Sequence, residues 1–278
     1  MPVKSAKRAA VADWSLPRKE LSGREREGFR PRPLERAQGG LGHFTRLLRR
    51  FADLQFGSIW DDLSLLLPEI RGTLADVGCG AQPFRDLLSP DVRYIGVDIA
   101  GSEEKFGYHA ADTRQIRGDV LPLADGEVDA VLCTETLEHV QKPRPFLEEI
   151  ARALVPQGRL ILTVPFAARW HFIPYDYWRY TPSGLANLLT EAGFCDVRIY
   201  PRGGALAVAG YKVLGFVLLL LAGRGSLGIA RIIWRALGVC LLPVGFAAML
   251  AGNLGLRYPG PAEDTLGYTA LARKAPAR

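Results

Sequence analysis

The chain has 278 residues, of which 48% are hydrophobic and 23% are charged. This length and composition support one sizeable α/β domain with an appendage. The four cysteines lie far apart and form no C-x-x-C pair, which argues against a zinc site and a disulfide framework and favours a reducing compartment. No hydrophobic stretch follows the basic N-terminus, so we do not expect a cleavable secretory signal.

Positive charge is concentrated at the start of the chain. Residues 1–50 contain 13 lysines and arginines against 5 acids, whereas the whole chain has a net charge of +6, so the remainder is slightly acidic. Residues 1–40 are rich in proline and are expected to form a basic, disordered leader. Such a leader could attract anionic lipid headgroups or nucleic acid. Aromatic residues suited to base stacking are sparse there, and we expect no nucleic-acid partner.

Apolar residues recur at helical spacing from Gly42 to Leu67, with a break near Gly57. This pattern predicts one or two helices that pack on a following sheet.

The stretch 73–100 predicts a strand, a glycine turn, a helix and a second strand in succession. The first apolar run leads into Gly78 and Gly80, a helix is expected over 83–88, and the second run ends at Asp98. Glycines let the backbone turn sharply and approach a ligand, and a following helix points free N–H groups at it. An acid about 20 residues further on can accept hydrogen bonds from ribose hydroxyls. The stretch therefore predicts a nucleotide-like ligand.

A dinucleotide site would need a third glycine, but after Gly78 and Gly80 this chain has Phe84 and no third glycine. The run Asp76-x-Gly78-x-Gly80 instead resembles the first motif, (D/E)-x-G-x-G, of the class I S-adenosylmethionine-dependent methyltransferases, in particular their small-molecule, type 11-like branch. Many members carry another glycine where this chain has Gln82. The resemblance implies a Rossmann-like α/β fold with a seven-stranded sheet, helices on both faces and S-adenosyl-L-methionine as cofactor.

The same resemblance assigns roles to further strand ends. Asp119, one strand beyond Asp98, would accept a hydrogen bond from the adenine amine, and the backbone N–H of Val120 would face a ring nitrogen. Thr134 and Glu135 would line the methionine side of the crevice. The cofactor-binding residues implied in this way are Asp76, Gly78, Cys79, Gly80, Asp98, Ile99, Asp119, Val120, Thr134 and Glu135.

Glu135, Glu138 and His139 form an E-x-x-E-H stretch whose spacing lets all three face one way on a helical turn. It resembles stretches in quinone O-methyltransferases and in methyltransferases of RNA ends, where these residues can hold a divalent cation. A purely structural role for Glu138 and His139 is the commoner case across the wider family. We therefore assign no metal ligand from the sequence.

A helix is expected over Pro143–Leu154 and a strand over Arg159–Val164. The following stretch, Pro165–Thr181, is rich in aromatic and imidazole side chains and is expected to wall the acceptor pocket. Methyl transfer to a hydroxyl requires loss of its proton. The candidate catalytic residues are His139, His171 and Asp176. The alternative for this loop is a structural clasp in which Arg179 pairs with an acid or with the backbone.

The C-terminal part predicts a helix over Pro182–Ala192 and strands over Phe194–Tyr200 and Thr265–Arg273. The resemblance implies that the last strand inserts antiparallel into the sheet. The two strands are separated by a hydrophobic, helical insertion, 203–259. We accordingly expect the methyltransferase domain to comprise residues 41–202 and 260–275.

The insertion contains two apolar segments that suit a membrane. Ala236–Leu256 is 21 residues without a charge, and Gly203–Gly223 is another 21 broken by Lys212; either could span ~30 Å of hydrocarbon. Two crossings would place the arginines of the connector Arg224–Arg235 outside and bury Lys212, against the positive-inside rule. A shallow hairpin at the cytoplasmic headgroups avoids both costs. A buried helical subdomain and a dimer interface are the alternatives.

The sequence thus predicts a methyltransferase for a small or lipid-linked acceptor, of the quinone or saccharide–lipid type, at the inner face of the cell membrane. One alternative is a soluble enzyme whose insertion forms a dimer core. Another is a non-catalytic, membrane-associated scaffold that retains the fold.

Overall fold

The computed structural model describes residues 20–21, 30, 33, 35–108, 112–223, 228–258 and 263–276. Most of the leader predicted at 1–40 lies outside these residues, as does Arg224 of the connector.

In the described part of the chain, seven strands form one sheet in the order β3-β2-β1-β4-β5-β7-β6. β7 pairs antiparallel with both β5 and β6, whereas the other neighbours are parallel. The predicted antiparallel last strand is therefore confirmed. The strands are β1 (Thr73–Val77), β2 (Arg93–Ile99), β3 (Thr113–Ile116), β4 (Val128–Thr134), β5 (Leu154–Pro165), β6 (Phe194–Arg202) and β7 (Gly267–Lys274).

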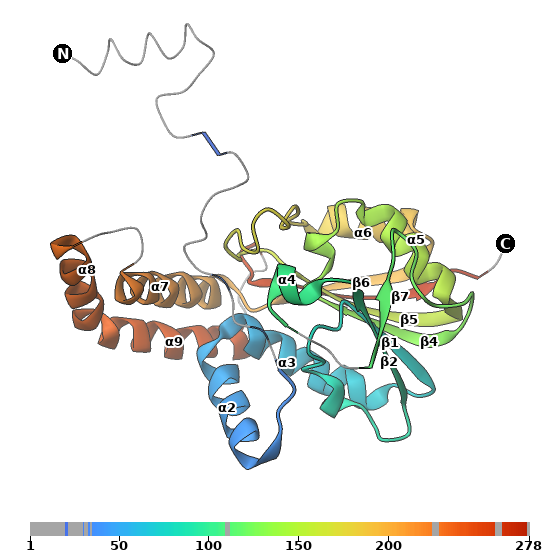
Figure 1. Ribbon diagram of the computed structural model, residues 1–278, viewed down its shortest axis with the longest axis horizontal. Helices are drawn as coiled ribbons and strands as arrows, with labels where there is room; N and C mark the ends of the chain where they lie inside the picture. The colour runs from blue at the N-terminus through green and yellow to red at the C-terminus, as the bar shows by residue number, and fades with distance from the viewer. Residues whose placement is uncertain are drawn as a thin grey trace, which may run out of the picture.

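Helices cover both faces of the sheet (Figure 1). α5 and α6 pack on one face around Leu147 and Leu185, and α3 packs on the other through Phe56 and Leu63. Helices cover both sides of β1 and β4, which explains why the sequences of these strands are nearly continuous apolar runs. The α-helices are α2 (Gly39–Ala52), α3 (Leu54–Leu66), α4 (Ser102–Phe106), α5 (Pro143–Ala153), α6 (Pro182–Glu191), α7 (Ala205–Ala222), α8 (Ile229–Cys240) and α9 (Leu242–Arg257).

Two local predictions near the sheet edge were wrong. The helix expected over 83–88 is a 3-10 turn, Arg85–Leu87. The link from β1 to β2 is short, and Gln82 at a φ of 58° interrupts helical geometry just before the predicted start. The strand expected to end at Asp119 ends at Ile116, because Gly118 takes a φ of 72° and turns the chain.

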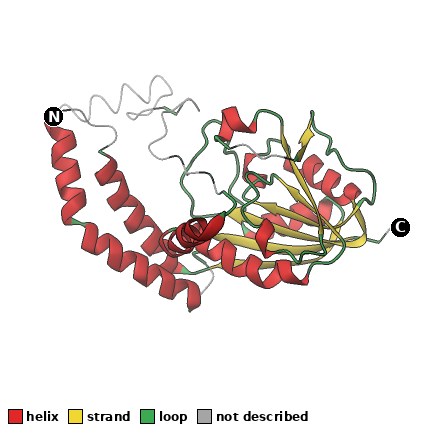
Figure 2. Ribbon diagram, turned by 60° about the horizontal axis from the view of Figure 1, so that its bottom comes forward, coloured by secondary structure: helices red, strands yellow, loops and turns green. Residues whose placement is uncertain are grey.

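The insertion forms a helical arm, consisting of α7, α8 and α9, that extends from the body (Figures 1 and 2). α7 lies along α9, where glycines permit close approach: a Cβ on Gly210 would lie 2.9 Å from the Cα of Gly252. The apolar segment predicted at 236–256 is broken at Leu241, where α8 and α9 meet at 51°. Among the described helices, α7 alone has the length and apolar character of a span, while α8 and α9 qualify only as a bent pair.

Candidate active site

A cavity of roughly 1110 Å³ opens at the carboxyl ends of β1, β2 and β4. This is where ligands bind in open α/β sheets. Most of the predicted cofactor residues line it, together with parts of α2, α7 and the aromatic-rich loop Pro165–Thr181. The predicted residues on its wall are Gly78, Cys79, Gly80, Asp98, Ile99, Asp119, Thr134, Glu135, His139 and His171.

The glycine turn after β1 has a left-handed backbone conformation that glycine adopts more readily than other residues. Gly78 and Gly80 have φ values of 75° and 52°, which side chains disfavour. The Gly78 N–H donates to the Val97 carbonyl at 2.8 Å, and a Cβ on Gly78 would overlap the Thr136 side chain. The turn is thus fixed against β2, and both glycines line the cavity.

Asp98 at the end of β2 holds this turn in place. Its carboxylate accepts from the Gly80 N–H at 2.9 Å and from the Ile99 N–H at 2.7 Å. Tyr108 also hydrogen-bonds to it, and burial raises the pKa of the carboxyl. Tyr108 was not predicted, since it lies in a polar stretch without periodicity.

Asp76 lies beneath the cavity, not on its wall. It is 1% exposed, and the Tyr94 hydroxyl donates to its Oδ2 at 2.8 Å. Burial raises the pKa of Asp76 to about 7 despite this hydrogen bond. Its Oδ1 is buried and accepts no hydrogen bond from the described residues.

Asp119 lies at the outer rim of the same cavity. Its side chain is 76% exposed and pairs with Lys142 at 3.1 Å, a contact that water screens and that costs little to break. Val120 is also exposed and lies just outside the wall. Asp98 and Asp119 therefore face one cavity, as the adenosine assignment requires.

Glu135 follows β4 with a φ of 46°, unusual for a residue other than glycine. Its carboxylate accepts from Nη2 of Arg202 at 2.8 Å. Arg202 is fully buried at the end of β6 and also donates to the Val164 carbonyl and the Ser58 hydroxyl. Sequence reasoning did not single out Arg202, because nothing in the strand pattern marks its terminal arginine as buried.

Glu138 and His139 lie on a 3-10 turn, Leu137–His139, beside the cavity. Burial and the nearby Glu135 carboxylate raise the pKa of Glu138 well above its ordinary value. Burial lowers the pKa of His139 to about 4, so its imidazole is neutral at pH 7. Its Nδ1 lies 2.7 Å from the Tyr175 carbonyl.

The structural clasp considered for the aromatic-rich loop is present. Arg179 donates to both carboxylate oxygens of Asp176, at 2.6 and 2.7 Å. The backbone N–H of His171 donates to the same carboxylate at 3.0 Å, and Nδ1 of the His171 ring also lies 3.0 Å from it. Burial opposes ionisation of Asp176, but the hydrogen bonds from His171 and Arg179 outweigh it and lower the pKa of the carboxyl. Asp176 therefore lies behind His171, away from the large cavity, and is placed to orient that imidazole.

The methyltransferase-domain family model matches residues 75–162, from β1 into β5. A probable S-adenosylmethionine-dependent methyltransferase of Mycobacterium tuberculosis is 30% identical over 140 residues, which cover 46% of this chain and 51% of that protein. A ubiquinone biosynthesis O-methyltransferase of Dechloromonas aromatica is 34% identical over 117 residues, which cover 37% and 48%. The chain thus spans about half the length of these relatives.

A crystal structure of an S-adenosylmethionine-dependent methyltransferase from Archaeoglobus fulgidus aligns with a TM-score of 0.48 at 17% identity, over 84% of this chain and 100% of that one. Independently of that alignment, the sheet has the strand order and the antiparallel β7 that the sequence motif implied. Together, the motif at β1, the sheet and the matched family model identify residues 75–162 as a methyltransferase domain of the class I S-adenosylmethionine-dependent type.

Proposed function

We propose that the protein transfers a methyl group from S-adenosylmethionine to an amphiphilic acceptor, of the quinone or saccharide–lipid type, at the cytoplasmic surface of a membrane. The observation that carries this proposal is the course of the cavity. It begins at the glycine turn and Asp98 and extends to Leu214 and Leu218 of α7, so one continuous space joins the cofactor end to the apolar arm.

The residues at the inner end fit the cofactor. The turn at Gly78 and Gly80 exposes bare backbone, Asp98 supplies a carboxylate for ribose hydroxyls, and Asp119 lies on the same wall for adenine. Pockets for small ligands usually measure about 300 to 1,000 Å³. The cavity of roughly 1110 Å³ is therefore large enough for the cofactor and part of an acceptor.

When bound, S-adenosylmethionine supplies a methyl group whose bond to the sulfonium breaks as the acceptor atom forms its bond and releases a proton, leaving a neutral thioether. The task of the protein is then chiefly to align the two molecules and exclude water. Phe106 and Phe172 pack edge to face at 5.2 Å between their ring centroids and form part of the cavity wall. His139 and His171 lie beside them, where they can influence the proton of an acceptor hydroxyl.

The direction of the side chains on α2 supports membrane docking. Arg46 and Arg50 turn toward the body, where they pair with Asp86 and Asp61. The opposite face is apolar and exposed, and no residue of α2 is buried. A helix of an ordinary soluble domain would have the reverse arrangement. The exposed apolar residues of α2 are Leu41, Phe44, Leu47, Leu48 and Phe51.

The arm presents a similar apolar surface. It lies next to α2, since Nδ2 of Asn253 on α9 donates to the Phe51 carbonyl at 2.9 Å. Lys212, in the middle of α7, donates to the Ala167 carbonyl of the body. That contact keeps the midpoint of α7 at the body, which favours a docked arm over a membrane-crossing α7. The exposed apolar residues of the arm include Phe216, Ile229, Ile232, Ile233, Trp234, Val244, Phe246 and Leu254.

Calorimetric titration with S-adenosylmethionine tests the cofactor assignment. We expect the Asp119→Ala variant to bind about tenfold more weakly, since one hydrogen bond to a charged group is worth roughly 1.5 kcal/mol or more. Asp91→Ala, which changes an exposed turn before β2, is the matched control and should bind normally. Absence of binding by the unaltered protein would overturn the enzyme assignment and favour the non-catalytic scaffold.

Transfer of labelled methyl groups tests the acceptor class. The protein is incubated with labelled S-adenosylmethionine and a cell extract that has been separated into membrane lipids and water-soluble compounds. We expect label in the lipid fraction. Label confined to the water-soluble fraction, together with failure of the protein to sediment with liposomes, would refute the lipid-linked acceptor.

A further inference from the structure

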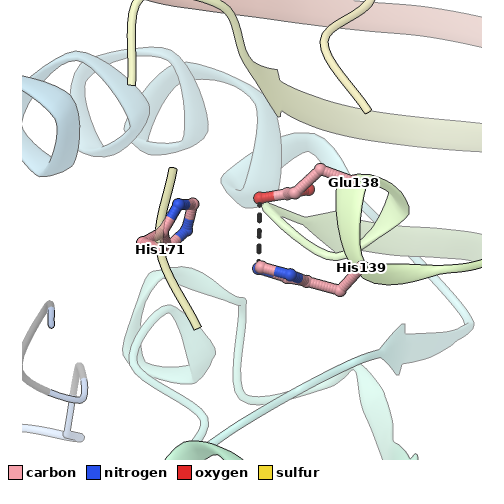
Figure 3. A group of neighbouring side chains, drawn as sticks. All are labelled: Glu138, His139 and His171. Atoms are coloured by element: carbon pink, nitrogen blue, oxygen red, sulfur yellow. Dashed lines mark ion pairs between the residues drawn. The ribbon is translucent and has the colours of Figure 1, made fainter. Parts of the chain in front are cut away.

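A group of side chains at the cavity lies outside the set assigned to the cofactor. Glu138, His139 and His171 come from two separate segments, and their potential ligand atoms all lie within 4.8 Å of one another. Figure 3 shows the Glu138 carboxyl directed at the His139 ring, with His171 facing both. Sequence reasoning could not join His171 to the other two, because it lies 32 positions after His139 and reaches them only through the folded loop.

Glu138 is the unusual member of this group. Its side chain is fully buried, and neither carboxylate oxygen has a hydrogen-bond partner among the described residues. The Nε2 atom of His139 lies 3.6 Å from Oε1, beyond hydrogen-bond length. Buried carboxylates nearly always have hydrogen-bond, ionic or metal partners. This carboxylate therefore points to a positively charged ligand.

Both imidazoles are held with one nitrogen free for such a ligand. Nδ1 of His139 lies 2.7 Å from the Tyr175 carbonyl, and Nδ1 of His171 lies 2.9 Å from the Arg169 carbonyl. A carbonyl oxygen only accepts, so each Nδ1 must carry the hydrogen. The lone pair then resides on Nε2 of each ring. Donation from the second nitrogen to a carbonyl or carboxylate is the usual support for a metal-binding histidine.

We propose that Glu138, His139 and His171 bind a divalent first-row transition-metal ion. Two imidazoles and one carboxylate suit such ions better than Mg²⁺ or Ca²⁺, which prefer oxygen ligands. Bonds of about 2.0–2.2 Å would draw the three ligand atoms somewhat closer together than they lie here. Glu135 is not part of the set, since its carboxylate is paired with Arg202.

The placement of the three ligands leaves an open side. His139 and His171 are on the cavity wall, whereas Glu138 lies behind it. A bound ion would therefore have free coordination positions toward the space that, according to the function proposed above, receives the acceptor. These positions suit the oxygen of an alcohol or a phenol, because coordination to the ion lowers the pKa of the O–H group. The inference thus favours an acceptor that is methylated on oxygen.

Cobalt titration tests the site directly. The full-length protein is treated with a chelator and titrated with Co²⁺, which is followed by visible absorption and calorimetry. We expect one equivalent to bind, and His171→Ala and Glu138→Gln to weaken binding at least tenfold. Glu138→Gln keeps the shape of the side chain and removes its charge. His43→Ala, which changes an exposed histidine on α2, should bind Co²⁺ as the unaltered protein does.

Two results would overturn the proposal: no Co²⁺ binding by the unaltered protein, or equal binding by His171→Ala. Titration of the same metal-free samples with S-adenosylmethionine separates this outcome from failure of the proposed function. Normal cofactor binding without Co²⁺ binding removes only the metal. Co²⁺ binding that depends on Glu138 and His171, without cofactor binding, retains the metal site and rejects the methyltransferase assignment.

Discussion

Arg202 and Glu135 form an ion pair at 2.8 Å in which the arginine is fully buried and the glutamate is about one quarter exposed, at 26%. The pair joins the end of β6 to the residue after β4. Because Arg202 also donates to Ser58 of α3, it fixes the turn at Glu135 relative to the helix that covers the sheet. The positive φ of Glu135 is thus stabilised by a tertiary contact.

Replacement of Arg202 by methionine should destabilise the protein. The substitution fills a similar volume but leaves Glu135 without its charged partner, and breaking a buried pair costs about 3–5 kcal/mol. Since Glu135 keeps some contact with water, we expect the free energy of unfolding, measured with urea, to fall by an amount near the lower end of this range. Arg198→Met, at an exposed position of β6, should change it by less than about 0.5 kcal/mol. Similar losses in the two variants would contradict the role of the pair.

Gly78→Ala should abolish cofactor binding. The φ of 75° already disfavours alanine, and the added methyl group would also overlap Thr136, so the turn must move. Gly126→Ala provides a matched control, because Gly126 has a φ of 62° with nothing within 4 Å of an added Cβ. We expect both variants to lose stability in thermal unfolding, but only Gly78→Ala to lose binding of S-adenosylmethionine in calorimetry. Equal binding by both would refute the close approach of the turn to the cofactor.

Stability should depend on pH through Asp76. Its pKa is raised by burial from the ordinary 3.8 to about 7, so between these values the folded protein keeps a proton that the unfolded chain releases. Folding therefore loses about 1.4 kcal/mol for each unit of rising pH within this window, and no more above it. Asp76→Asn retains an acceptor for the Tyr94 hydroxyl and does not titrate.

This dependence is measured by urea unfolding of both proteins without ligand between pH 4.5 and 8. The free energy of unfolding of the unaltered protein should fall relative to that of Asp76→Asn as pH rises toward 7. A constant difference between the two proteins would show that Asp76 is ionised in the folded state throughout.

The exposed face of α2 should contribute to membrane binding. The double variant Phe44→Ser, Leu48→Ser removes two apolar side chains that are 56% and 53% exposed. Burial of such a side chain is worth about 1.5–3 kcal/mol, so sedimentation with anionic phospholipid vesicles should weaken at least tenfold. Leu65→Ser changes a leucine of α3 that is 76% exposed and should leave sedimentation unchanged. Equal weakening of sedimentation by the double variant and by Leu65→Ser would show that overall surface hydrophobicity, and not the face of α2, determines vesicle binding.

Local patterns predicted β1 and β2 well because each is an apolar run that leads into a glycine or an acid. The bounds of α5 and α6 agree with the patterns to within one residue. The link after Gly80 was mispredicted, since the backbone at Gln82 depends on the surrounding loop. The end of β3 was mispredicted, because β3 is an edge strand of the sheet and none of its four residues is fully buried.

The site was most directly predictable where the chain presents its residues in one local unit. Asp98 and the glycines belong to one strand–turn–strand unit, so their proximity follows from local structure. The partners Tyr108 and Arg202 were not predicted, because they act through a loop without periodicity and through a contact between distant segments. Likewise, the orientation of α2 was not evident, because helical spacing identifies an apolar face but not whether it lies inward or outward.

The position of β7 has a consequence for the order of synthesis. β5 and β6 do not touch each other, because β7 separates them, and the arm precedes β7 in the chain. During translation the arm therefore leaves the ribosome while β6 still lacks its neighbour in the sheet. The hydrophobic helices of the arm are thus synthesised before the last strand closes the sheet, and under the membrane docking proposed above they would meet the lipid bilayer before the fold is complete.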